Sequence, residues 1–184
     1  MARIQRLDGD DLETHLTSFS ALLIACVEAG ASIGFLAPLT CERAEAFWRE
    51  IAESLRREER LLFAALDDEN GLLGTAQLVP AALENQPHRA DVSKMMVSPA
   101  ARRQGVGLQL LEALEEEARA RGRWLLVLDT ATGSPAEALY RKQGWERIGE
   151  IDDYALWPDG RLCATTFYRR DLRQSCSLSS AISP

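Results

Sequence analysis

The chain is expected to form one α/β domain over residues 1–172, in which helices pack against a β-sheet. Segments with apolar residues at helical spacing alternate with short apolar runs that are typical of strands. One such strand, residues 90–97, runs through a glycine-bearing turn into a long amphipathic helix and then into the apolar run 124–128. A length of 184 residues with 46% hydrophobic content allows one full core and leaves little room for a second domain.

In the N-terminal third, a short strand is followed by two helices. The acidic turn that begins at Asp8 caps apolar residues that repeat at helical spacing as far as Ala29. Thr40 caps a second amphipathic helix, which ends in the charged run 56–60, a typical solvated face. The loop 30–38 between the helices is glycine-flanked and apolar, so we expect either a lid or pocket wall or a segment folded back onto the core.

The rest of the chain alternates strands with two further helices. Asn70-Gly71 is a hairpin turn signal, and the continuous apolar run 124–128 indicates a strand covered on both faces. Ser134-Pro135 caps a short helix that Gly144 ends. The predicted elements are a strand at 2–7, helices at 12–29 and 41–60, strands at 61–66, 72–79 and 90–97, a helix at 105–121, a strand at 124–128, a helix at 135–143, and strands at 145–151 and 162–171.

An Arg-x-x-Gly-x-Gly pattern, from Arg102 to Gly107, joins the strand at 90–97 to the next helix. Backbone N–H groups converge at a helix start and favour an anion such as phosphate, and the arginines can add charge-assisted contacts. The spacing fits neither a dinucleotide fingerprint, which needs a third glycine, nor a P-loop, which needs Gly-Lys-Ser/Thr. An ordinary tight turn would use the same glycines, so the motif alone leaves both interpretations open.

Composition argues against several classes of partner. A formal charge of -7 and a pI near 5.0 oppose a nucleic-acid surface. No apolar run approaches the roughly 18 to 20 residues of a membrane helix, so we expect a cytoplasmic protein with no membrane partner. Widely spaced cysteines and only two histidines suggest neither a zinc site nor disulfides. Buried thiols are expected instead, with Cys176 on a tail, residues 173–184, that is expected to be disordered.

Two segments resemble motifs of the GNAT N-acetyltransferases. The turn from Arg102 to Gly107 is similar to the acetyl-CoA pyrophosphate motif Gln/Arg-x-x-Gly-x-Gly/Ala, and residues 136–145 are similar to Ala-x-x-Leu-Tyr-x-x-x-Gly-Phe. Further segments resemble the tabtoxin-resistance acetyltransferases, which inactivate an amino-acid toxin, and they lie at 30–35, 90–97, 128–130 and 158–162. The resemblance implies the GNAT fold, a central mixed, mostly antiparallel sheet with flanking helices, and acetyl-CoA as cosubstrate without a metal.

The resemblance also implies a site. Asp91, Asp129 and Tyr140 would be catalytic, and Ser32 and Phe35 would bind the acceptor together with the two aspartates. The implied CoA ligands are the backbone at Met96 and Val97, the turn residues Arg102, Arg103, Gln104, Gly105, Val106, Gly107 and Leu108, and Ser134.

These residue types suit acetyl transfer to an amine. An alkyl ammonium must lose a proton before it attacks a thioester, so a base is required. An aspartate has a reference pKa near 3.9, so Asp91 or Asp129 must be desolvated, coupled to the other, or assisted by water. Asp91 is one methylene shorter than the glutamate of the tabtoxin-resistance proteins, which favours proton transfer through a bridging water over direct abstraction. Tyr140 could donate its proton to the departing CoA thiolate. Structural roles stay open: backbone hydrogen bonds for the aspartates and ring packing for Tyr140.

The sequence therefore predicts an N-acetyltransferase that moves acetyl from acetyl-CoA to a primary amine of a small amino-acid-like metabolite, toxin or antibiotic. Direct attack in a ternary complex is expected, because no cysteine lies in either motif to carry the acetyl group. Two alternatives stay open: a protein or peptide N-acetyltransferase, and a non-catalytic acyl-CoA-binding module. We expect a monomer or a homodimer.

Overall fold

The computed structural model describes residues 2–174, and the observed elements follow the predicted order with one interruption. The strands are β1 (Arg3–Leu7), β2 (Leu61–Leu66), β3 (Leu72–Pro80), β4 (Arg89–Val97), β5 (Leu125–Ala131), β6 (Glu146–Leu156) and β7 (Leu162–Asp171). The helices are α1 (Gly9–Thr14), α2 (Leu16–Glu28), α3 (Cys41–Arg56), α4 (Val106–Ala120) and α5 (Pro135–Lys142), with short 3-10 turns at Pro99–Ala101 and Leu172–Gln174. Residues 175–184, which include most of the predicted tail and Cys176, lie outside the described residues.

The first two predicted helices differ from the observed ones. The helix expected at 12–29 is divided at His15, because α1 is a separate short helix that starts at Gly9 and packs on α3. A Cβ on Gly9 would lie 2.7 Å from the Ala52 carbonyl oxygen, so only glycine allows this close approach. The second helix ends at Arg56, before the end of its charged run, because the chain turns at Glu58 with a positive φ of 56°.

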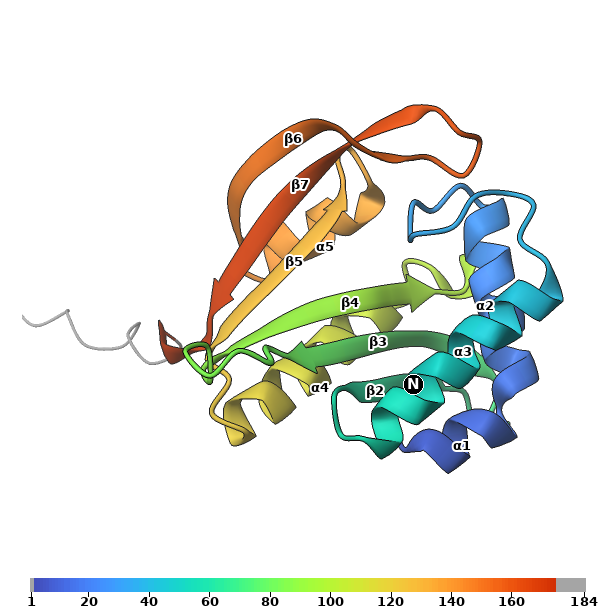
Figure 1. Ribbon diagram of the computed structural model, residues 1–184, viewed down its shortest axis with the longest axis horizontal. Coiled ribbons are helices and arrows are strands. Elements are labelled where there is room, and N and C mark those ends of the chain that lie inside the picture. The colour runs from blue at the N-terminus through green and yellow to red at the C-terminus, as the bar shows by residue number, and fades with distance from the viewer. Residues whose placement is uncertain (1, 175–184) are drawn as a thin grey trace, which may run out of the picture.

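The strands form one seven-stranded sheet in the order β1-β2-β3-β4-β5-β7-β6 within the described residues. All neighbouring pairs are antiparallel except β4 and β5, which are parallel because α4 connects them as a crossover. The predicted mixed, mostly antiparallel sheet is thus confirmed. Pairing between β4 and β5 is confined to Arg89–Asp91 and Leu125–Val127, after which the two strands run apart (Figure 1).

Each face of the sheet has its own core. Helix α4 packs with Leu110, Leu111 and Leu114 on one face, and α1 to α3 cover the other face around Trp48 (Figure 1). On β5 the α4 face is buried, but Val127 and Asp129 on the opposite face are partly or fully exposed. The prediction that this strand is covered on both faces was wrong, because β4 diverges and no helix replaces it there.

A β-bulge interrupts β4 near its middle. Thr75 and Gln77 of β3, two residues apart, pair with Met96 and Ser93, three apart, so β4 has one extra residue. Lys94 takes a left-handed φ of 49° at this place. The alternation of faces changes as a result: Ala90 and Val92 face α4 before the bulge, whereas Met96 after it is in the core beneath α1 to α3.

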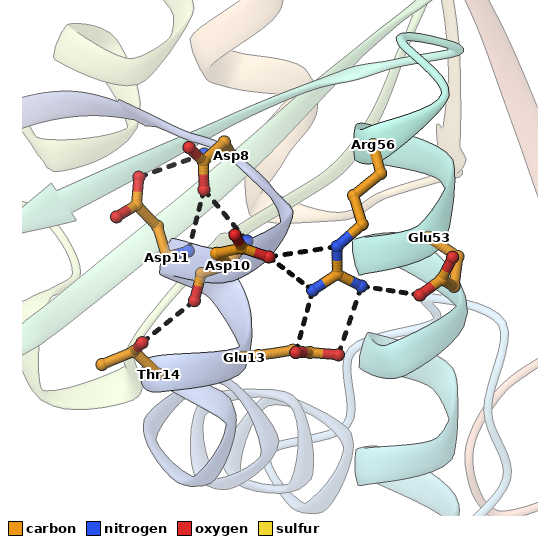
Figure 2. A network of polar contacts seen from close by, with 7 residues as sticks. All are labelled: Asp8, Asp10, Asp11, Glu13, Thr14, Glu53 and Arg56. Atoms are coloured by element: carbon orange, nitrogen blue, oxygen red, sulfur yellow. Dashed lines mark hydrogen bonds and ion pairs between the residues drawn. The ribbon is translucent and has the colours of Figure 1, made fainter.

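The start of α1 and the end of α3 are held together by ion pairs. Asp8 caps α1 as predicted, in a capping box with Asp11. The guanidinium of Arg56 lies between the carboxylates of Asp10, Glu13 and Glu53 (Figure 2). The charged run that begins at Arg56 is therefore not merely a solvated face, since its first residue joins two helices.

The described cysteines form no disulfide: Cys26 and Cys163 are buried as predicted, whereas Cys41 is exposed. The prediction failed at Cys41 because this residue begins α3 on its outer face, where the thiol faces Glu45.

No described helix is long and apolar enough to cross a membrane.

Candidate active site

Asp91 and Asp129 lie on the same face of the sheet where β4 and β5 begin to separate. Asp91 is opposite Val127 in the parallel pair, and Asp129 follows two residues later on β5. Their neighbours Ala90, Val92 and Leu128 belong to the core beneath α4, so both aspartates face away from α4. The structure thus brings together the two carboxylates that were predicted as catalytic.

The electrostatics of this face centre on Asp129. Burial raises the pKa of Asp91. The Arg89 guanidinium opposes this rise, since its Nη1 donates to Asp91 Oδ1 at 3.3 Å. The negative charge of Asp129 raises the pKa of Asp91 further. The negative charge of Asp129 also acts to raise the pKa of Lys94 and that of Tyr140. These groups therefore share one electrostatic environment. Asp91 does not have the backbone-bonded structural role left open by the sequence, since its hydrogen-bond partner is the Arg89 side chain.

Tyr140, on α5, is a buried ring with a protonated hydroxyl. Its ring centroid lies 5.8 Å from that of Trp145 and 5.9 Å from that of Tyr168. Burial, together with the charge of Asp129, raises the pKa of Tyr140 far above its ordinary value. Within residues 2–174 the hydroxyl has no hydrogen-bond partner. Ring packing therefore explains why Tyr140 is buried, but it gives the hydroxyl proton no acceptor.

The turn before α4 has the geometry of an anion site. Arg103 and Gly105 both have left-handed φ values, 61° and 84°, and Gly105 is the N-cap without a side-chain cap bond. The first intrahelical bond comes from Gln109, so the N–H groups of residues 106–108 have no acceptor within the described chain. Arg102 and Arg103 are exposed beside them. Free donors, the helix dipole and two arginines fit a CoA pyrophosphate.

The other predicted CoA residues have mixed surroundings. The side chains of Met96 and Val106 are buried, so only their backbone could meet a ligand. A Cβ on Gly107 would lie 3.2 Å from Leu139 Cδ2, so the glycine lets α5 pack closely against the start of α4. The Gln104 amide donates to the Ala100 carbonyl, and Ser134 occupies the predicted cap position of α5 with its Oγ bonded to Thr130 instead of capping the helix. Val97 and Leu108 are half-buried.

The loop 30–38 folds over this face and makes several contacts. Ser32 Oγ donates to the Leu156 carbonyl at 2.9 Å, which ties the loop to β6. Phe35 packs edge-to-face on Phe47 of α3, with ring centroids 5.2 Å apart. The loop therefore packs back onto the protein, as one of the two sequence-based expectations proposed, and Phe35 lies beside the aspartates' face while the Ser32 hydroxyl proton is already used.

Lys94 was not among the predicted site residues. Its ammonium donates to the Ile33 carbonyl at 2.8 Å and lies 6.0 Å from the ring centroid of Phe35 and 5.8 Å from that of Phe47. Burial lowers the pKa of Lys94, while the negative charge of Asp129 opposes this change. The signal that could have found it is a lysine directly before the apolar residues Met95–Val97 that lead into the turn motif.

A hollow of about 260 Å³ lies beside the loop 30–38 and the β6–β7 turn. Val27, Gly30, Ala37, Trp157 and Pro158 are among its lining residues. None of the predicted site residues lines the hollow, so we assign the chemistry to the two carboxylates and not to this hollow.

Among residues 2–174 no group of three or more His, Cys, Asp or Glu side chains could hold a metal ion.

Comparison with known proteins agrees with this fold. Residues 27–145, more than half of the chain, match the model of the acetyltransferase (GNAT) family. An uncharacterized N-acetyltransferase from the hisH-hisA intergenic region of Azospirillum brasilense is 40% identical over 105 residues, which are 56% of this chain and 60% of that protein. The chain thus spans three-fifths of the length of this relative.

Two solved structures have the same fold. A ribosomal-protein-alanine N-acetyltransferase from Brucella melitensis is 27% identical, with a TM-score of 0.73 over 92% of this chain and 99% of that one. A phosphinothricin acetyltransferase from Sinorhizobium meliloti, solved in complex with AcCoA, is 22% identical, with a TM-score of 0.77 over 93% of this chain and 88% of that one.

Proposed function

The chain belongs to the acetyltransferase (GNAT) family, and we propose that it is an N-acetyltransferase that moves acetyl from acetyl-CoA to a primary amine of a small amino-acid-like molecule. The observation that carries this proposal is that Asp91 and Asp129 share one face of the sheet where β4 and β5 separate, while the buried Tyr140 hydroxyl feels the charge of Asp129. The free N–H groups at the start of α4 support CoA as the acetyl donor.

The residues can divide the chemistry as follows. Asp91 and Asp129 hold the acceptor ammonium and take up its protons, Asp91 through a water. The amine nitrogen then bonds to the thioester carbon while the C–S bond breaks, and Tyr140 protonates the departing sulfur. The nitrogen loses two protons in total: one replaces the Tyr140 proton that ended on sulfur, and the other leaves to solvent. The high pKa of Tyr140 keeps it protonated for this role at neutral pH.

Backbone groups can contribute to the same step. Pairing of β4 with β5 stops at Asp91 and Val127, so the backbone of β4 beyond Asp91 faces the gap that opens beside β5, and the bulge at Lys94 lies in this part of the strand. A free N–H there would polarise the thioester carbonyl and stabilise the oxyanion that forms on attack. No cysteine lies in the turn before α4 or in α5, which supports direct attack without an acetylated enzyme.

The amino-acid-like acceptor, of the kind that the tabtoxin-resistance enzymes inactivate, is supported by paired carboxylates and a cation on one face. A peptide acceptor is the second candidate, because the net charge of -7 would attract basic peptides and one structural neighbour bears the name of a ribosomal-protein-alanine N-acetyltransferase.

CoA release from acetyl-CoA is the test, measured with a thiol reagent for a panel of free amino acids, small amines and peptides. We expect steady turnover with amino acids and no acetyl group on the enzyme by intact-mass spectrometry. Turnover with peptides alone would transfer the proposal to the peptide acceptor. CoA binding without release from any amine would identify a binding module and sink the enzymatic proposal.

A further inference from the structure

Lys94 is an exception in the composition of the chain. Of 21 Lys and Arg residues, only Lys94 and Lys142 are lysines. Lys142 is exposed at the end of α5, whereas Lys94 lies within β4 with a left-handed φ. A lysine offers a compact point charge on a flexible stem, where arginine offers a wide planar fork. The chain therefore has a small, adjustable cation at the bulge of the strand that carries Asp91.

The ammonium of Lys94 is only partly used by the protein. Its one acceptor within residues 2–174 is the Ile33 carbonyl, at 2.8 Å, and no described carboxylate forms an ion pair with it. An ammonium has three N–H donors, so two are left for another partner. The rings of Phe35 and Phe47 line its surroundings and exclude water, which strengthens any charge–charge contact made there.

Nearby groups add donors rather than acceptors. Gln77 pairs with Ser93 across the β3–β4 ladder and lies on the face opposite to α4, since Ala76 and Leu78 face α4. The Gln77 side-chain oxygen accepts from Arg60 Nη1 at 2.9 Å, and its Nε2 is buried without a partner. These donors favour an anion, and no described carboxylate pairs directly with Lys94, although the charge of Asp129 acts on it.

We propose that Lys94 binds the carboxylate of the acceptor while Asp91 and Asp129 hold its amine. The inference rests on the proposed function and specifies its substrate class: amines with a carboxylate a few bonds away, as in amino acids. Three residues along a strand span about 10 Å between Cα atoms, so flexible side chains can converge on the two ends of such a molecule. The loop 30–38 assists, because its Ile33 carbonyl orients the ammonium.

Matched acceptors test this assignment: free L-amino acids and their carboxamides, which keep the amine and side chain but lack the negative charge. In the wild-type protein we expect kcat/KM for CoA release to be at least about tenfold higher for the acids. Lys94→Met should reduce the acid-to-amide ratio by about tenfold, and Lys94→Arg should keep part of it. Lys142→Met, the matched control at the only other lysine, should leave the ratio as in the wild type.

The ratio separates recognition from folding, since a merely structural loss lowers both rates together. An unchanged ratio in Lys94→Met would overturn the inference while the acetyltransferase proposal stands. If no acceptor releases CoA, the proposed function fails, and a binding experiment tests the carboxylate site instead. N-acetylglycine should raise the melting temperature of the CoA-bound wild type, whereas N-acetylglycinamide should not. Neither compound should raise the melting temperature of Lys94→Met. Equal effects of the two compounds on the wild type would overturn the carboxylate assignment.

Discussion

Two groups of charged residues in this molecule differ in how completely their charges are paired. In the Arg56 cluster (Arg56, Asp10, Glu13 and Glu53), one guanidinium contacts three carboxylates at 2.6 to 2.8 Å (Figure 2). In the acceptor cluster (Asp91, Lys94 and Asp129), no two members form an ion pair, although the Asp129 charge influences both of the others.

The difference indicates what each cluster can do. The nitrogens of Arg56 are all engaged, which raises its pKa and leaves no donor for a ligand. In the acceptor cluster, Asp91 pairs with Arg89 at 3.3 Å, but Lys94 pairs with no described carboxylate. A partly buried charge without a partner is unfavourable until a ligand of opposite charge arrives. We therefore expect substitutions in and beside the acceptor cluster to alter catalysis, and substitutions in the Arg56 cluster to alter only stability.

The largest effect is expected at Tyr140, next to the acceptor cluster. Tyr140→Phe keeps the ring contacts with Trp145 and Tyr168 but removes the proton donor. We expect kcat to fall by about 10² to 10³, the usual contribution of general acid catalysis. Steady-state CoA release checks this, with the melting temperature as the control for folding. A kcat within threefold of the wild type would show that Tyr140 only packs.

Asp129→Asn should have the next largest effect, a loss of about 10² in kcat/KM, because it removes the charge that acts on three neighbours. The pH profile gives a second readout. The Asp129 charge raises the pKa of Asp91, so its removal lowers that pKa, and Asp91 becomes a deprotonated base at lower pH. The rising limb of kcat/KM should therefore move to lower pH. A limb that stays in place would exclude Asp91 as the titrating base.

Arg89→Met should move the same limb in the opposite direction with a smaller loss of rate. Arg89 lowers the pKa of Asp91, so without it Asp91 stays protonated to higher pH. We expect the rising limb of kcat/KM to move to higher pH, while the rate on the plateau above it changes by about threefold or less. The pH profiles of both variants, measured in one buffer series, check the pair of signs. Shifts in the same direction would contradict the assignment of the base.

The fold and the positions of most candidate site residues in the predicted elements were predictable because their signals are local. The turn from Arg102 to Gly107 and the helix that bears Tyr140 are continuous segments, and the structure places both in the predicted elements. Asp91 and Asp129 face the same side because Asp91 lies opposite Val127 and alternate residues of a strand share a face; the alternation follows from the sequence, but the register of β4 against β5 does not.

Other features depend on contacts between distant segments. The break at His15 leaves the apolar spacing intact, so periodicity could not reveal it. The bulge at Lys94 arises from the register of β3 against β4. The hydrogen-bond acceptor of Lys94, the Ile33 carbonyl, is 61 residues away in the chain. No pattern within the segment 90–97 encodes either fact. The available sign was a lysine directly before the apolar residues Met95–Val97, and only its contact with the loop 30–38 shows what it does.

The smallest effect on catalysis is expected in the Arg56 cluster, and it tests the comparison directly. Arg56→Met keeps the apolar stem that contacts Gly9 but removes the guanidinium that joins α1 to α3. Because these carboxylates are largely exposed, we expect the melting temperature to fall by only about 1 to 3 °C. The kcat/KM should stay within about twofold of the wild type. A tenfold loss in kcat/KM with an intact fold would mean that pairing does not distinguish structural from catalytic charges in this protein, and α1 would then have to act on the acceptor face through α3 and Phe47.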